Sequence, residues 1–226
     1  MENSRTVMIP KAKKPEAREH RPIALTNVGY KIFMGLIKDK IVEYLRRRSD
    51  QENEYQSGFT GGRRLEENLF MLHYCVETSY KRREQLIVIA IDFAKAFDSV
   101  NRVALLGALT AYGCDPAMID VVVKLYTNDY TEIYKVDVKI GQMEVQNGIW
   151  QGCTGSPQLF VLIVNTIIRA ITACTLGYRD NEFYIPALFF ADDGLLLARR
   201  VWIGDKHTEE QLHYFQQCGG GDWKVP

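Results

Sequence analysis

The sequence has no uninterrupted apolar run long enough to cross a bilayer. Its longest apolar stretch, residues 159–176, is interrupted by Asn165 and Arg169, whereas a spanning helix needs about 20 consecutive apolar residues. The chain begins with Met-Glu-Asn-Ser-Arg, which lacks the apolar segment of a secretory signal peptide. We therefore expect an intracellular protein, nuclear or cytoplasmic and not secreted, with no membrane partner.

Cysteine patterns typical of disulfide or zinc frameworks are also absent. The 226 residues include five cysteines, an odd number, and no two of them form a Cys-x-x-Cys pair. Buried free thiols in a reducing compartment are the simplest interpretation. Internal repeats and low-complexity segments are absent as well, and a hydrophobic content of 46% indicates a globular chain with a sizeable core.

Charge of one sign is not in excess, because 28 Lys and Arg balance 28 Asp and Glu. The distribution is uneven, however: residues 1–50 hold 12 of the basic residues and 6 of the acidic ones. A basic first segment could face a polyanion such as nucleic acid. A solvated helix face behind a flexible start would give the same pattern, so charge alone leaves both interpretations open.

Hydrophobic periodicity predicts an α/β chain of the α+β type. Residues 1–22 carry three prolines among lysines and predict an extended basic arm. Ser156 and Pro157 are typical of a helix start, with Ser as N-cap and Pro at the first helical position. The spacing of apolar residues predicts helices over 27–48 (capped by Thr26 or Asn27), 65–82, 101–112, 116–128 and 156–173.

Three regions predict strands. The continuous apolar run at 85–93 predicts a strand buried on both faces. Residues 133–138 and 142–145 predict a hairpin with Gly141 near its turn. Residues 184–190 and 195–199 predict two strands joined through residues 191–194.

Carboxylates stand at two of these strand ends. Asp92 ends the apolar run, and Asp192 and Asp193 lie at the second turn. A carboxylate at an apolar strand end costs desolvation free energy unless it is paired or bound to a metal, and Mg²⁺ prefers such oxygen ligands. Asp-Gly is also a common hairpin turn and Asp a common helix cap, so spacing alone does not bring the three acids together.

In order, nine segments resemble the reverse transcriptase of non-long-terminal-repeat (LINE-type) retrotransposons. The most specific are Asp92-Phe-Ala-Lys-Ala-Phe97-Asp-Ser-Val and Phe190-Ala-Asp-Asp193. The resemblance covers residues 8–199. The matching segments are residues 9–11, 14–15, 21–25, 30–31, 56–59, 92–100, 148–153, 156–160 and 190–193.

The resemblance implies a right-hand polymerase fold of fingers and palm, with a small, mostly antiparallel sheet backed by helices. By this mapping residues 1–85 are fingers and 86–200 are palm. The thumb would be absent, and 201–226 would be an atypical tail, truncated or frameshifted. The implied function is RNA-directed DNA polymerase, which adds dNTPs to a DNA primer on an RNA template; the oligomeric state is not indicated.

The resemblance also assigns roles to residues. It makes Asp92, Asp192 and Asp193 catalytic, with Asp92 and Asp192 as ligands of two Mg²⁺ ions or of Mn²⁺ in their place. Phe97 would screen the sugar against a 2′-hydroxyl, although a core Phe is the alternative. The implied nucleotide-binding residues are Phe93, Phe97, Gln151, Gly152, Arg21, Arg63 and Arg64, and the implied nucleic-acid-binding residues are Lys11, Lys14, Gly58, Ser156 and Pro157.

Three alternatives stay open at this point. The chain could be an inactive remnant that binds nucleic acid, a group II intron-type reverse transcriptase, or an RNA-dependent RNA polymerase. The bulky Phe97 disfavours the last, because an RNA polymerase must admit the 2′-hydroxyl. The basic run 46–48 is interpreted as a solvated helix face in preference to a nucleic-acid contact.

Overall fold

The computed structural model forms two compact units, which are described separately. The first comprises residues 1–48 and 100–160, and the second comprises 49–99 and 161–226. These units are defined by packing, so the division into fingers and palm at residue 85 stays a prediction. The structure describes residues 4–10, 20–47, 54–127, 130–135, 138–173, 177–180 and 183–199.

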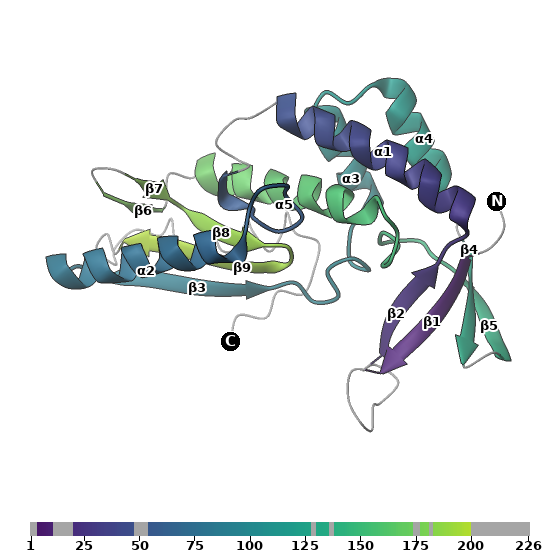
Figure 1. Ribbon diagram of the computed structural model, residues 1–226, viewed down its shortest axis with the longest axis horizontal. Helices are drawn as coiled ribbons and strands as arrows, with labels where there is room; N and C mark the ends of the chain where they lie inside the picture. Colours follow the sequence, from purple (N-terminus) through teal and green to yellow (C-terminus); the bar gives the residue numbers. More distant parts are fainter. Residues whose placement is uncertain are drawn as a thin grey trace. The chain divides into compact units, whose positions relative to one another are not determined.

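The first unit contains a four-stranded sheet in the order β2-β1-β4-β5 (Figure 1). β1 pairs antiparallel with β2 and parallel with β4, and the buried hydroxyls of Thr6 and Thr131 hydrogen-bond across β1 and β4 at 2.6 Å. The expected basic arm is therefore extended, but its described residues are not free of the fold. The strands are β1 (Ser4–Pro10), β2 (His20–Leu25), β4 (Tyr130–Lys135) and β5 (Val138–Glu144).

The β4–β5 hairpin is present, but the prediction of Gly141 near its turn is wrong. The two strands connect between Lys135 and Val138. Gly141 lies inside β5 opposite Ile133, where the register shifts at a β-bulge. Glycine is common at bulges as well as turns, so its presence alone does not separate the two.

Three helices of the described structure lie wholly within the first unit, and each begins at a polar N-cap, of which only the first is predicted from the sequence. The Asn27 side chain accepts a hydrogen bond from the Tyr30 N–H at 2.7 Å. Asn101 and Asp115 cap the next two helices in the same way, which satisfies amide donors that a helix start leaves open. The helices are α1 (Val28–Arg47), α3 (Arg102–Ala111) and α4 (Pro116–Tyr126).

The second unit contains a three-stranded antiparallel sheet in the order β3-β9-β8. The helix α2 (Leu65–Arg82) lies along it in Figure 1 and packs Cys75 into a cluster with Leu188 and Leu197. A mixed fold of helices and small, mostly antiparallel sheets is confirmed. The strands are β3 (Leu86–Asp92), β6 (Tyr178–Arg179), β7 (Tyr184–Ile185), β8 (Ala187–Phe190) and β9 (Asp193–Arg199).

β3 is not buried on both faces, so that part of the prediction is wrong. Ile87 and Val88 are 41% and 42% exposed. Among the described residues β3 pairs only with β9 and is therefore an edge strand. A continuous apolar run indicates a strand but does not determine its place in the sheet.

The helix α5 (Ser156–Ala173) is long and apolar enough, by length and composition, to cross a membrane. The interruption at Asn165 does not prevent this. However, 56% of the helix is buried within the fold, and Leu159, Leu162 and Ile168 are fully buried. Core helices of soluble proteins pass the same test, so α5 is weak grounds for a span.

Three of the five cysteines lie in the described residues. Cys75, Cys114 and Cys153 are buried free thiols, as expected; Cys174 and Cys218 lie outside the described residues. Burial raises the pKa of Cys75 to about 11, with a further contribution from the charge of Asp180. Burial alone raises the pKa of Cys114 to about 11.

Candidate active site

Three carboxylates meet at one end of the three-stranded sheet. Asp92 is the last residue of β3 and lies directly opposite Asp193, the first residue of β9. Asp192 lies in the two-residue turn that joins β8 to β9 at the same end of the sheet. The turn is formed by Ala191 and Asp192 instead of Asp193 and Gly194, because Gly194 already pairs with Ile91 in the ladder. The pairing of β3 with β9 therefore brings the three acids together, which their spacing in the sequence alone could not predict.

The electrostatics agree with this convergence. Burial raises the pKa of Asp193, and the negative charges of Asp192 and Asp92 raise it further. Among the described residues no cation pairs with these acids. No group of three or more His, Cys, Asp or Glu in the described part of the chain is arranged to hold a metal ion. Within the described ranges this end of the sheet is therefore a concentration of negative charge.

An apolar groove of about 390 Å³ runs up to two of these acids. Leu65 and Leu69 of α2 line one side, the strands line the other, and Asp92 and Asp193 lie on its wall. Leu65 and Leu69 are about half exposed, at 45% and 56%. Asp92 and Asp193 are themselves exposed, so the apolar lining desolvates them only in part, in the direction of the raised pKa of Asp193.

A short segment supports the β8–β9 turn from behind; we refer to residues 56–58 as the supporting segment. Gln56 is fully buried and forms a parallel bridge with Phe189 of β8. Its side-chain oxygen accepts hydrogen bonds from the Ala191 N–H at 3.0 Å and the Gly58 N–H at 2.8 Å. Its amide nitrogen donates to the Ala191 carbonyl at 3.2 Å.

Gly58 packs directly against the turn. A Cβ at this position would lie 2.0 Å from the Ala191 nitrogen and 2.8 Å from the Phe190 carbonyl carbon. This packing accounts for a glycine at position 58 by itself, while the predicted contact of Gly58 with nucleic acid stays a prediction. The residue is buried in the structure.

Asn68 of α2 secures the same region. Its side-chain nitrogen donates to the Phe189 carbonyl at 2.9 Å, and its oxygen accepts from the Ser57 hydroxyl at 2.8 Å. The Ser57 N–H also donates to the Phe189 carbonyl, at 2.9 Å. Sequence reasoning gave Gln56 and Asn68 no role, because a buried amide and an exposed one look alike in a sequence; the motif around Gln56 was the only signal.

Two aromatic side chains of the nucleotide-binding prediction lie near the acids in sequence. The ring of Phe97 packs edge-on against Phe59, with centroids 6.4 Å apart. Phe93 packs against Phe189, also at 6.4 Å. Phe97 is half-buried, not enclosed, so part of its ring surface faces outward.

Arg63 and Arg64 immediately precede α2. The Arg63 guanidinium forms an ion pair with Glu67, one turn into the helix, at 3.3 Å. Arg64 is the N-cap residue but makes no capping hydrogen bond with its side chain, and it is exposed. Arg64 therefore has the freer side chain of the two for an anionic ligand.

The first unit brings a second set of predicted residues together. The Gln151 carbonyl accepts a hydrogen bond from the Ala24 N–H of β2 at 2.8 Å. Gly152 has φ +99°, and a Cβ there would lie 3.1 Å from the Ala24 carbonyl. Arg21 lies on the same strand, opposite Ile9. Gln151 and Gly152 are thus tied to the strand that carries Arg21.

Ser156 and Pro157 begin α5, as predicted, but Ser156 does not cap it with its side chain. Ser156 is the first helical residue, and its buried hydroxyl has no hydrogen-bond partner in the described structure. The neighbouring Gly155 packs against Met34 of α1, where a Cβ would lie 3.1 Å from the Met34 carbonyl oxygen. The nucleic-acid contact expected for Ser156 and Pro157 stays a prediction.

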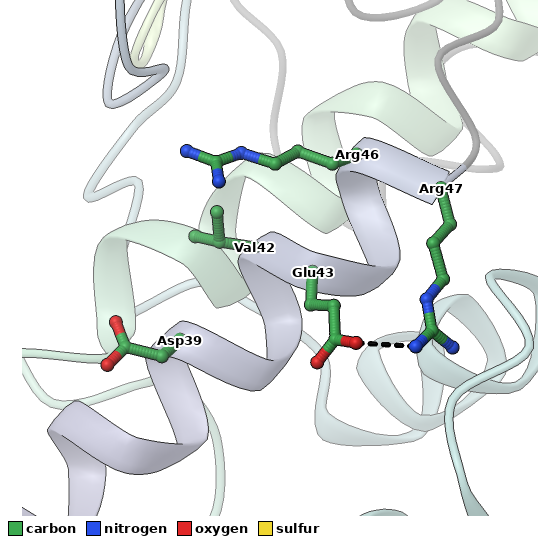
Figure 2. A pocket seen from close by; sticks show the side chains of 5 residues that line it. All are labelled: Asp39, Val42, Glu43, Arg46 and Arg47. Carbon is green, nitrogen blue, oxygen red and sulfur yellow. Dashed lines mark hydrogen bonds and ion pairs between the residues drawn. The ribbon is translucent and has the colours of Figure 1, made fainter.

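Of the other basic residues discussed in the sequence analysis, only some can be placed. Lys11 and Lys14 lie outside the described residues. Figure 2 shows a depression on α1 where Arg47 is paired with Glu43. Lys40 and Arg47 lower the pKa of the Glu43 carboxyl by hydrogen bonding and charge. These pairs agree with the interpretation of this basic run as a solvated helix face.

Comparison with known protein families gives a match over most of the chain. Residues 9–219 match the family described as "Reverse transcriptase (RNA-dependent DNA polymerase)". The match extends 20 residues beyond Arg199, where the resemblance noted in the sequence ends. A retrovirus-related Pol polyprotein from the type-1 retrotransposable element R2 of Bradysia coprophila is 29% identical over 94% of this chain and 24% of its own length. The corresponding protein of Popillia japonica is 31% identical over 59% of this chain and 22% of its own length. The chain thus spans about a quarter of the length of these relatives.

Solved structures share the fold. Telomerase from Candida albicans, solved with a fragment of telomeric RNA, aligns with a TM-score of 0.63 over 96% of this chain and 39% of that one, at 8% identity. Apo telomerase from Candida tropicalis, truncated from its C-terminal domain, aligns with a TM-score of 0.61 over 96% of this chain and 48% of that one, at 14% identity. At such low identity the likeness concerns the fold.

Proposed function

Because the chain belongs to the reverse transcriptase (RNA-dependent DNA polymerase) family, we propose that it adds dNTPs to the 3′-hydroxyl of a DNA primer on an RNA template. The relatives from R2 retrotransposons confirm the expected resemblance to non-long-terminal-repeat reverse transcriptases. The fold is the right-hand polymerase fold. The observation that carries the proposal is the meeting of Asp92, Asp192 and Asp193 at one end of a single sheet.

The donor chemistry of the three acids suits divalent cations, which the family generally uses, although the described side chains are not grouped closely enough to form a metal site as they stand. Their oxygens are the hard donors that Mg²⁺ and Mn²⁺ prefer, and the raised pKa of Asp193 reflects negative charge that no described cation offsets. Asp92 and Asp192 would hold two Mg²⁺ ions, with Asp193 beside them. When bound, such ions neutralise charge on the transferred phosphoryl group and make the primer hydroxyl a better nucleophile.

The chain's own residues would orient the reactants. The ladder between β3 and β9 holds Asp92 and Asp193 at fixed positions, as positioning catalysis of phosphoryl transfer requires. Arg21 and Arg64 would hold phosphate oxygens, since guanidinium forks match them. Arg63 would do so only by exchanging its pairing with Glu67.

Aromatic and glycine residues would shape the nucleotide site. Phe97 would exclude a 2′-hydroxyl, supported by its edge-on contact with Phe59, and Phe93 would line the site beside it. Gln151 and Gly152 would lie along the nucleotide and template base, held in place by their contacts with β2. Replacing Phe97 with Val should raise ribonucleotide use, and unchanged selection against ribonucleotides would remove Phe97 from this role.

Template and primer would contact the chain more widely. Lys11, Lys14, Gly58, Ser156 and Pro157 are proposed contacts, with residues 1–85 as fingers, 86–200 as palm and 201–226 as an atypical tail. We also place the protein inside the cell, in the nucleus or cytoplasm. Salt-dependent binding to primer–template is expected from the phosphate contacts, and retained binding in Arg21→Ala would dismiss that residue from the set.

Primer extension on an RNA template with dNTPs and Mg²⁺ tests the proposal. Asp192→Asn should lower incorporation by about 1000-fold, because about 4 kcal/mol of charge stabilisation is lost. Asp120→Asn, on the exposed face of α4, is the matched control and should keep wild-type activity. Binding of primer–template without any incorporation by the wild-type chain would favour the inactive remnant instead.

A further inference from the structure

The residue before Asp192 has an unusual backbone conformation. Ala191 has φ +58°, in the left-handed region that a residue with a Cβ adopts only at a cost in free energy. Ala191 is also buried, at 8% exposure, so water does not satisfy its backbone polar groups freely. Something in the fold must stabilise this conformation.

Gln56 supplies that stabilisation from the supporting segment. Its side-chain amide meets both backbone groups of Ala191, accepting from the N–H at 3.0 Å and donating to the carbonyl at 3.2 Å. Two hydrogen bonds to the groups on either side of one Cα restrict rotation about both φ and ψ of that residue. A third bond, from the Gly58 N–H at 2.8 Å, holds the Gln56 side chain itself in place.

The rotation of Ala191 sets the direction in which the chain enters Asp192. Resting on the proposed function, we propose that Gln56 is a positioning residue that holds Ala191 in its left-handed conformation and thereby aims the Asp192 carboxylate at the reaction centre. Gln56 itself lies beneath the turn and touches no substrate. It acts through two main-chain hydrogen bonds to the neighbour of a catalytic acid.

The chemistry of the contact explains why an amide suits this position. One side chain must accept from an N–H and donate to a carbonyl at the same time, which Gln can do and an ionised Glu cannot. Leu would fill nearly the same volume but leave the Ala191 and Gly58 groups without partners in a buried site. Gln56→Leu therefore removes the bonds and keeps the packing.

The test compares Gln56→Leu with the wild-type chain in two measurements. The first is the exchange rate of the Ala191 and Gly58 amide hydrogens, followed by NMR. The second is steady-state primer extension, with kcat and the KM for dNTP determined separately. We expect faster exchange at both amides, and a kcat lower by about 100-fold, the cost of a misplacement of about 1 Å, with KM for dNTP unchanged.

Asn68→Leu is the matched control. It removes a side-chain amide from the same support, with its bonds to Phe189 and Ser57, but leaves Ala191 bonded. We expect comparable loss of thermal stability with kcat retained and slow exchange at Ala191. If both variants lower kcat equally, Gln56 is only structural and the inference is overturned.

Two further outcomes separate this inference from the proposed function. Unchanged exchange at Ala191, or unchanged kcat, in Gln56→Leu would overturn the inference while leaving the polymerase proposal intact. If the wild-type chain incorporates nothing, the polymerase proposal fails for this chain. In that case amide exchange alone decides whether Gln56 holds Ala191: faster exchange in the variant supports this, and unchanged exchange refutes it.

Discussion

The sheet of the second unit and the sheet of the first differ in what surrounds their strands. In β8, Ala187, Leu188 and Phe189 are all buried, whereas every residue of β5 except Gly141 is exposed. The buried hairpin carries charged residues at its turn and is held there by side-chain amides from elsewhere in its unit. In the first unit β5 is the exposed partner of the β4–β5 pair, while β4 contributes the buried Thr131. The strands that carry the candidate catalytic carboxylates are thus more deeply buried than β5, which carries none of them.

The largest expected effect comes from crowding the buried turn. Gly58→Ala would place a Cβ 2.0 Å from the Ala191 nitrogen, and a backbone atom cannot move aside as a side chain can. We expect a loss of about 3 kcal/mol in the free energy of unfolding, measured by urea denaturation. Gly61→Ala, with no atom within 4 Å of its added Cβ, should change stability by less than about 0.5 kcal/mol. Equal effects would mean that the supporting segment does not pack as described.

A smaller effect should separate two glycines that both lie within hairpin strands. Gly194→Ala would place a Cβ 2.3 Å from the buried ring of Phe189, and we expect a loss of about 2 kcal/mol. Gly141→Ala meets no atom within 4 Å, and the lower entropy of its unfolded chain should stabilise the protein by about 0.5 kcal/mol. Thermal unfolding of the two variants tests both the expected loss of stability in Gly194→Ala and the expected gain in Gly141→Ala. A loss of stability in Gly141→Ala would show that β5 is more constrained at its bulge than its exposure indicates.

The smallest effect concerns the cores, where the two units are alike. The thiols of Cys75 and Cys114 bind protons more tightly in the folded chain than in the unfolded one, with pKa values of about 11 against an ordinary 9.0. The contribution of each thiol to stability is therefore fully present below pH 9 and falls as pH rises toward 11, by about 1 kcal/mol per thiol at pH 10. Replacing either cysteine with Ala should flatten this fall in urea titrations at pH 8 and pH 10. If the free energy of unfolding of Cys75→Ala falls with pH as steeply as that of the wild-type chain, while Cys114→Ala flattens the fall, water reaches the Cys75 thiol in the core of the second unit.

Local patterns predicted much of this fold. The bounds of α2 follow from its apolar spacing, and the start of α1 follows from its polar cap, because both signals depend on neighbouring residues. The edge position of β3, the bulge at Gly141 and the shifted turn at Asp192 could not be predicted, since each depends on which strands pair. The prediction of one strand over 184–190 is wrong for the same reason, because Pro186 separates β7 from β8 and the two pair with different strands.

The candidate site shows the same division. The acids were found from their place at strand ends and from the family motifs, and the fold places Asp92 opposite Asp193. The support from Gln56 and Asn68 was not found, because 135 residues separate Gln56 from Ala191 in the chain. The roles of Gln56 and Asn68 depend on their burial and on partners distant in sequence, and no local sequence pattern indicates either.

The parallel bridge between Gln56 and Phe189 also affects how the small sheet can grow. With Gln56 and Ser57 bonded along β8, that side of the sheet has its main-chain groups partly occupied. Within the described residues the other side, β3, keeps an unpaired margin. Among the described strands, a further strand would therefore find free main-chain groups along β3 and few along β8, so this sheet can be extended in one direction.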